Sequence, residues 1–219
     1  MNNFLSGWDV VPSGNQSTSG GKTNFTKFAE GTTRIRVLDN TPHLRWAHWI
    51  PQISRKITCA GFGCPIEELN KRSKAQGGNN IYDNSRAFSF NIWNLNENRH
   101  ELMEEGVTFF DELKLAMIDA VEANPGIDIS SFLFKVRKGT NSQRKATWRI
   151  DLEEVSEFTN QVSLVDRMEY FKPPTIEQVN QILAIDNPDK DERIARYVEI
   201  MGFGSNNNEE ALPFEVEEV

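Results

Sequence analysis

The stretch that decides the fold is residues 131–155, SFLFKVRKGTNSQRKATWRIDLEEV, where two alternating segments flank a polar turn that contains a glycine. Alternation with a period of two is typical of β-strands that bury one face, so this stretch predicts a β-hairpin. The residues expected to pack inward are Phe132, Phe134, Val136, Trp148 and Ile150. Lys135, Arg137 and Arg149 are then expected on the opposite face.

The segment before the hairpin changes period. In 107–123, VTFFDELKLAMIDAVEA, apolar residues recur every three to four positions, which predicts an amphipathic helix. The residues expected on its buried face are Phe109, Leu113, Ala116, Met117 and Ala120. Pro125 and Gly126 follow directly and are expected to end the helix.

Three strands are expected upstream of this helix. TTRIRVL (32–38) places Ile35 and Val37 on one face and Arg34 and Arg36 on the other. The aromatic stretch 44–58 contains Pro51 and is expected to form one bent strand or two short ones. RAFSFNIWNL (86–95) alternates again and predicts a strand with Phe88, Phe90 and Ile92 inside. Arg34 and Arg36 are expected to extend the basic face that Lys135, Arg137 and Arg149 form on the hairpin.

The order of elements is strand, long strand, strand, helix and hairpin. This order favours a mainly β fold, a five-stranded OB-fold barrel with its helix between the third and fourth strands. Additional helices are expected at 65–73, 175–185 and 189–202. The expected segments are a flexible N-terminal arm (1–24), an OB-fold domain (25–158), a helical extension (159–203) and a disordered acidic tail (204–219).

Charge is distributed unevenly along the chain. The net charge is −8, yet 22–150 holds 19 basic and 14 acidic residues, whereas 151–219 holds 5 basic and 17 acidic ones. A basic body with an acidic end predicts an anionic partner for the body.

The tryptophans are accompanied by basic residues, a combination that binds single-stranded nucleic acid because bases stack on rings while cations neutralise phosphates. For any single ring on a strand, a place in the core is favoured, because strands are rich in aromatic residues in any case. Trp46 and Trp49 lie on opposite faces of their strand, so one of them is expected to face a binding groove, and the sequence leaves open which. The candidate nucleic-acid-binding residues are Arg34, Arg36, Arg45, Trp46, Trp49, Arg55, Lys56, Arg86, Trp93, Lys135, Arg137 and Arg149.

Metal binding and catalysis find less support in the sequence. Cys59 and Cys64, with His43 and His48 upstream, leave a structural zinc ion open as an alternative. Because His43 and His48 would point to opposite faces of a strand, two reduced cysteines in a glycine turn are favoured, and no cofactor is expected.

The acidic clusters ELMEE and DLEE are expected to be solvated. No motif of a nucleotide-binding or hydrolytic enzyme is present, so a non-enzyme is expected.

The chain has no run of about 18 apolar residues and no signal-like start, which indicates neither membrane insertion nor secretion. With two cysteines, the expected setting is a reducing cytoplasm.

Two stretches resemble phage-encoded and bacterial single-stranded DNA-binding proteins of the OB-fold type. The tail EEALPFEVEE (209–218) is similar to their acidic tips, which end in Pro-Phe among acids, although five residues follow Phe214 here. The segment from Arg45 through KITCAGFGCPIEELNKR resembles a phage region in which an aromatic strand leads into a cysteine-containing loop. In some phage members that loop holds zinc, with a further cysteine shortly after Cys-Pro; here the sequence is Cys64-Pro65-Ile66-Glu67.

The resemblance implies a protein that protects single-stranded DNA in replication, recombination and repair, in the host cytoplasm if phage-encoded. The acidic tail is expected to compete for the basic groove and, through Leu212, Pro213 and Phe214, to recruit replication or recombination proteins. A plain solubilising tail is the alternative. An RNA-binding OB-fold regulator and a metal-dependent nuclease remain alternative functions.

Overall fold

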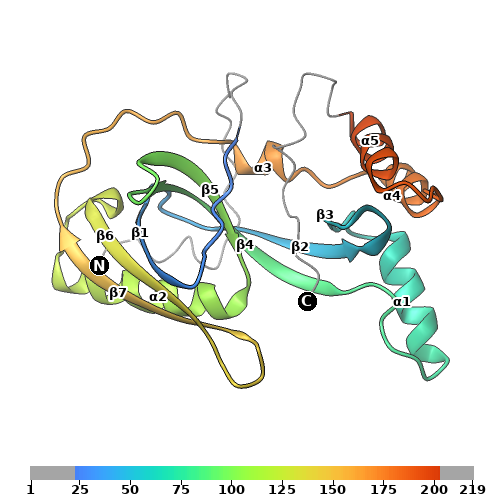
Figure 1. Ribbon diagram of the computed structural model, residues 1–219, viewed down its shortest axis with the longest axis horizontal. Coiled ribbons are helices and arrows are strands. Elements are labelled where there is room, and N and C mark those ends of the chain that lie inside the picture. The colour runs from blue at the N-terminus through green and yellow to red at the C-terminus, as the bar shows by residue number, and fades with distance from the viewer. Residues whose placement is uncertain (1–22, 203–219) are drawn as a thin grey trace. The chain divides into compact units, whose positions relative to one another are not determined.

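The computed structural model describes residues 23–202. Within this range seven strands form an open, antiparallel sheet, and several helices accompany it. The strands are β1 (Gly31–Val37), β2 (His43–Ile50), β3 (Arg55–Thr58), β4 (Asn84–Asn94), β5 (Arg99–Glu105), β6 (Phe132–Thr140) and β7 (Ala146–Val155). They pair in the order β3-β2-β4-β1-β6-β7, with β5 pairing with β4 (Figure 1).

The helices are α1 (Pro65–Ala75), α2 (Val107–Ala123), α3 (Arg167–Tyr170), α4 (Ile176–Leu183) and α5 (Lys190–Met201), with 3-10 turns η2 (Pro51–Ile53) and η3 (Ile129–Ser131). The described chain divides into two compact units, and each is assembled from separate segments. Unit 1 comprises 23–44 and 87–170, and unit 2 comprises 45–86 and 171–202. Strands β2 and β4 contribute residues to both units.

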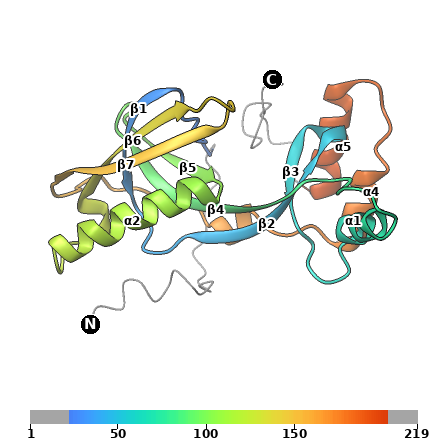
Figure 2. The same ribbon diagram turned by 90° about the horizontal axis from the view of Figure 1, so that it is seen from below.

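Unit 1 is built around helix α2 and the β6–β7 hairpin. The two views agree that α2 runs along this hairpin (Figures 1 and 2). The predicted inner face of the helix is confirmed, because Phe109, Leu113 and Met117 are almost completely buried. They pack in one cluster with the predicted inward residues Phe134 and Val136. Burial of a large apolar side chain contributes about 1.5–3 kcal/mol, so this cluster stabilises the hairpin's register.

Unit 2 has a second, smaller apolar core. Ile53, Ile57 and Ile66 are buried there together with Val179 and Ile182 of α4. Helix α4 packs on α1 and α5, and α5 packs on η2. Its helix ends follow sequence rules: Pro65 occupies the first turn of α1, and Gly202 ends α5 in the left-handed region with φ 68°.

Most of the expected elements are confirmed, including the break of the long strand at Pro51 and the hairpin. Strand β5 was not expected, because its sequence RHELMEE carries three acids. Glu101 and Glu104, expected to be solvated, are both buried. Glu101 accepts hydrogen bonds from Thr26, Asn94 and Arg99, which compensates its lost hydration. The described strands form an open sheet instead of a closed barrel.

The expected arm (1–24) and tail (204–219) lie outside the described residues, apart from 23 and 24. That residues 25–158 fold as one independent domain stays a prediction. No helix among the described residues is both long enough and apolar enough to span a membrane.

Candidate metal centre and nucleic-acid interface

The ladder between β2 and β3 brings a histidine and a cysteine to one face of the sheet. Its register pairs Ala47 with Thr58 and His48 with Ile57. The amide of Cys59 continues the ladder by donating to the carbonyl of Trp46 at 2.8 Å. Side chains that lie opposite each other in an antiparallel pair share a face, and so do alternate residues of one strand. Cys59 therefore lies on the face of His48.

A tight loop then returns the chain to the same place. Gly61 and Gly63 have φ values of 82° and 77°, in the left-handed region where side chains with a Cβ are strained. The amide of Cys64 donates to the carbonyl of Gly61 at 3.1 Å, and Cys64 directly precedes the first residue of α1. The two glycines thus allow the loop between the cysteines to close.

The result is a compact group of three potential ligands. His48 is completely buried and Cys64 nearly so, and Cys59 is partly buried. The ligand atoms of these three residues lie within 4.8 Å of one another. The Sγ atom of Cys64 is 3.7 Å from Nε2 of His48. No other group of this kind occurs in the part of the chain that the structure describes.

The electrostatics of the group favour a thiolate at Cys64. Burial raises the pKa of Cys64, but hydrogen bonds from His48 and from the amides of Glu67, Ala60 and Ile66 outweigh it, so the pKa is lowered overall. Burial raises the pKa of Cys59, and the neighbouring Cys64 raises it further. A thiolate is the form that binds a metal.

The donor set fits zinc. Imidazole nitrogen and cysteine sulfur are its usual ligands in proteins, and two sulfurs exclude magnesium and calcium, which prefer oxygen. The nitrogen that faces Cys64 is Nε2, while Nδ1 of His48 is buried without a hydrogen-bond partner among the described residues. The sequence disfavoured zinc because His43 and His48 would point to opposite faces of a strand. His43 is not needed, because His48 alone joins the two cysteines.

Unit 2 also holds six of the candidate nucleic-acid-binding residues. Trp46 is 52% exposed, and the guanidinium of Arg86 lies 5.8 Å from its ring centroid. Trp49 and Lys56 are opposite each other in the β2–β3 ladder and both are partly exposed. Arg45 and Arg55 are buried, and Arg45 lies 4.4 Å from the ring of Phe171. The sequence left open whether Trp46 or Trp49 faces a binding groove. Trp46 is the more exposed of the two and is therefore the better candidate.

Unit 1 holds the other six, and the sheet register brings most of them onto one face. Arg34 is opposite Lys135, Arg137 is opposite Arg149, and Arg36 is opposite Trp93. The predicted common face of the five cations is therefore confirmed.

That face is nevertheless mixed in sign, contrary to the expectation of cations alone. Arg34 makes two hydrogen bonds to Glu153, at 2.7 and 3.0 Å. Arg137 and Arg149 both pair with Asp151. The ladder places Asp151 opposite Lys135, and the ladder is irregular at Leu133/Phe134, opposite the segment that contains Glu153. The strand that supplies Arg149 thus also supplies the neutralising acids.

Two further candidates in unit 1 are covered by the chain itself. The guanidinium of Arg36 donates to the carbonyls of Ser131 and Ser156 at 2.8 and 3.0 Å and is buried. Phe158 lies against both Arg36 and Trp93, with ring centroids of Phe158 and Trp93 5.7 Å apart. The segment after β7 therefore occupies part of the face expected to bind nucleic acid.

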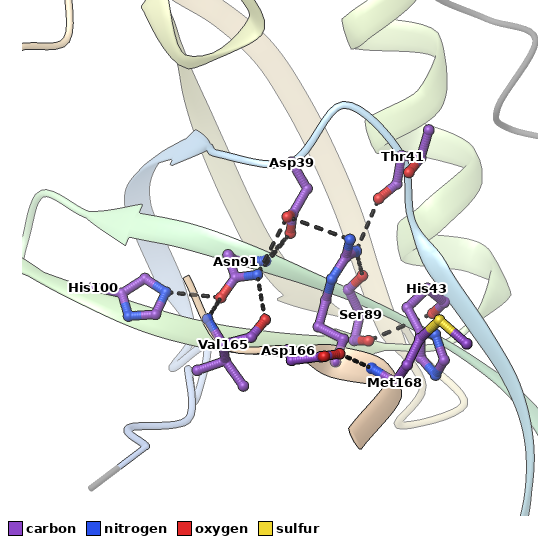
Figure 3. Close-up of polar contacts among 10 residues, drawn as sticks. Asp39, Thr41, His43, Ser89, Asn91, His100, Val165, Asp166 and Met168 are labelled. Carbon is purple, nitrogen blue, oxygen red and sulfur yellow. Dashed lines mark hydrogen bonds and ion pairs between the residues drawn. The ribbon is translucent and has the colours of Figure 1, made fainter. Parts of the chain in front are cut away.

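A buried polar network holds the end of this segment in place (Figure 3). Asn91 accepts the amide of Val165 at 2.9 Å and donates to its carbonyl at 3.1 Å. Asn91 also donates to Asp39, which pairs with Arg167 at 3.3 Å. Burial raises the pKa of Asp39 and lowers the pKa of Arg167, although each partner opposes this change. Since these groups satisfy one another, the network has a structural role.

The expected partner-binding residues Leu212, Pro213 and Phe214 lie outside the described residues. Comparisons with protein-family models, with curated proteins and with solved structures give no match.

Proposed function

We propose that this chain is a non-enzymatic protein that binds single-stranded DNA without sequence preference. The observation that carries the proposal is the half-exposed ring of Trp46 with Arg86 beside it. A ring open to solvent next to a cation allows a base to stack while a phosphate is neutralised.

The loop between the cysteines supports the same function. Phe62 is fully exposed, and it stands between Gly61 and Gly63. A large aromatic side chain held in solvent by a tight loop forfeits the stabilisation it would gain in a core, which is explained if it contacts a ligand. Phe62 was not among the residues expected from the sequence, and we propose it as a second stacking residue.

We further propose a partly open OB-fold, with a different assignment of its strands. The five strands would be β1, β4, β5, β6 and β7, and α2 then lies between the third and fourth, as this fold requires. The ladders β1–β4, β4–β5, β1–β6 and β6–β7 support it. Strands β2 and β3 would belong to an insertion after the first strand. A ladder that closes the barrel is absent from residues 23–202.

We also propose a structural zinc ion held by His48, Cys59 and Cys64. Its ligands flank the loop that carries Phe62 and adjoin Trp46 in the β2–β3 ladder. Zinc would supply no chemistry to a bound strand; these residues would fix the loop and thereby the position of the exposed rings.

The role in replication, recombination or repair, the cytoplasmic setting and the recruitment of partner proteins through Leu212, Pro213 and Phe214 belong to the same proposal. Acids near Phe214 would steer the tail and the phenylalanine would anchor it. Deleting 205–219 should then raise the affinity for single strands most at low salt, where screening is weakest.

The test is a titration of tryptophan fluorescence with oligo-dT, oligo-U and duplex DNA over a series of salt concentrations. We expect quenching by oligo-dT, weaker binding of duplex, and a log–log slope of about −0.7 per phosphate neutralised. Equal affinity for duplex overturns the proposal. Preference for oligo-U favours the RNA-binding alternative, and cleavage of the strand in magnesium or manganese favours the nuclease.

A further inference from the structure

The carboxylate of Glu67 lies beside the imidazole nitrogen that faces Cys64. Its Oε1 atom is 3.7 Å from Nε2 of His48, and Sγ of Cys64 is 3.7 Å from the same nitrogen. An N–H···O hydrogen bond at 3.7 Å would be too long. Two ligand atoms of one tetrahedral zinc ion are separated by roughly 3.3–3.8 Å, as follows from bond lengths of about 2.0–2.3 Å. The two separations from Nε2 are therefore those of neighbouring ligands, whereas the carboxylate lies outside the group of ligand atoms within 4.8 Å of one another and must turn towards the sulfurs to complete a tetrahedron.

The start of helix α1 explains why Glu67 is there. Cys64 is the residue before the helix, and Pro65 begins it. The amide of Glu68 donates to the carbonyl of Cys64 at 3.1 Å, which closes the first turn. Residues three positions apart on a helix lie on the same side, so Glu67 returns to the side of Cys64.

A second side chain orients the carboxylate. Nδ2 of Asn84 donates to Oε1 of Glu67 at 2.7 Å. Carboxylate ligands are commonly held by such a hydrogen bond from a residue that does not touch the metal. The side chain of Glu67 is 31% exposed, whereas that of His48 is not exposed at all, so Glu67 lies nearer to solvent than the imidazole.

We propose that Glu67 is the fourth ligand of the metal ion held by His48, Cys59 and Cys64, and that Asn84 positions it. This inference rests on the zinc centre proposed above. Two thiolates, one carboxylate and a neutral imidazole give the zinc site a net charge of −1. An oxygen ligand in place of a third sulfur makes the site harder and its metal easier to exchange.

The experiment uses Co²⁺ as a spectroscopic probe on the full chain, after chelation under reducing conditions. The wild-type protein should bind one Co²⁺ with an intense visible spectrum typical of four-coordinate cobalt and a sulfur-to-cobalt band of two thiolates. Glu67→Cys should raise that band by about half, because three sulfurs then bind, and should tighten binding. Glu67→Ala should weaken Co²⁺ binding more than Asn84→Ala, for which we expect about 10–100-fold.

The matched control is Glu68→Ala. Glu68 is the next residue, is exposed and pairs with Lys71 at 3.0 Å, so its loss should leave the affinity and the spectrum of Co²⁺ unchanged. Circular dichroism checks that every variant is folded. If Glu67→Ala and Glu67→Gln both keep the wild-type spectrum and affinity, a water molecule is the fourth ligand and the proposal is wrong.

Failure of the zinc centre has a different signature. If the wild-type protein binds no Co²⁺ at all, the centre and the role of Glu67 are both overturned. Binding of oligo-dT is measured on the same sample, and it tests the DNA-binding function independently of either result.

Discussion

Units 1 and 2 both combine aromatic rings with cations, yet they present them differently. In unit 1, acids of β7 neutralise Arg34, Arg137 and Arg149, and Phe158 covers Trp93. In unit 2, Trp46 faces solvent beside Arg86. The rings and cations of unit 1 therefore make contacts within the fold, whereas Trp46 and Arg86 of unit 2 remain accessible to a ligand. Their accessibility, more than their number on a face, indicates where a strand could bind.

The largest effect is expected from removing the metal ion proposed for unit 2. Its apolar core is small, so losing a structural ion should lower its unfolding temperature by at least about 10 °C, which corresponds to only about 2 kcal/mol for a unit of this size. Calorimetry with and without a zinc chelator measures the shift. Zinc added back should restore the original transition, and an unchanged transition after complete chelation contradicts the proposed ion.

The comparison between the units is tested most directly by two tryptophans. Trp46→Ala should weaken binding of oligo-dT by about 1–3 kcal/mol, because an exposed ring is lost as a stacking surface. Trp93→Ala should change affinity little, since Phe158 already occupies its side. Anisotropy of a labelled oligonucleotide measures both. A larger loss for Trp93→Ala would move the binding surface to unit 1 and require Phe158 to be displaced.

Phe62→Ala sharpens the same comparison within unit 2. The ring is fully exposed, so its removal should leave the unfolding temperature unchanged while weakening binding of oligo-dT by about 1–3 kcal/mol. Chelation should remove most of this difference between wild type and variant if the metal holds the loop. Equal affinities of the two proteins in the presence of zinc would show that Phe62 contacts no base.

Salt dependence should distinguish the cations by a smaller margin. Arg86→Ala should reduce the slope of log affinity against log salt by about 0.7, the value for one phosphate on a single strand. Arg137→Ala should reduce it less, because Asp151 already pairs with that guanidinium. Asp151→Asn is the informative control. If unit 1 binds DNA, this change frees two arginines and steepens the slope; if it does not, the slope stays as it is.

Local patterns made much of the fold predictable. Alternation located β1, β4 and the β6–β7 hairpin, and period 3.6 located the buried face of α2. Strand β5 was missed because Glu101 is buried against Thr26, 75 residues away, and against Asn94 on the neighbouring strand, contacts that no local pattern reports.

The candidate sites were predictable only in part, for the same physical reason. The common face of Arg34 and Lys135 follows from period two, but the pairing of Arg34 with Glu153 joins residues 119 positions apart and depends on how β1, β6 and β7 are ordered in the sheet. The candidate metal centre is hard to see in the sequence because His43 and His48 form an apparent pair, of which only His48 lies near the cysteines. The sequence contains His48, Cys59 and Cys64, yet only the β2–β3 register and the loop between the cysteines show that these three potential ligands converge.

The smallest effect is expected from His100, in unit 1. Nε2 of His100 lies 2.9 Å from Oδ1 of Asn91. Because the amide of Val165 also donates to that oxygen, it is an acceptor, so Nε2 of His100 is the donor. Burial lowers the pKa of His100, and nearby Glu101 opposes this only in part. The unfolded chain, with an ordinary histidine pKa of about 6.5, then binds more protons than the folded one just below that pH. Stability from this residue is therefore fully present above about pH 6.5 and is lost as pH falls towards the folded pKa.

His100→Gln removes the titrating group and keeps a donor, so urea unfolding of the variant should depend less on pH between about 5 and 8 than that of the wild type. Both proteins share every other histidine, and identical pH dependence would show that His100 titrates alike in the folded and unfolded chain.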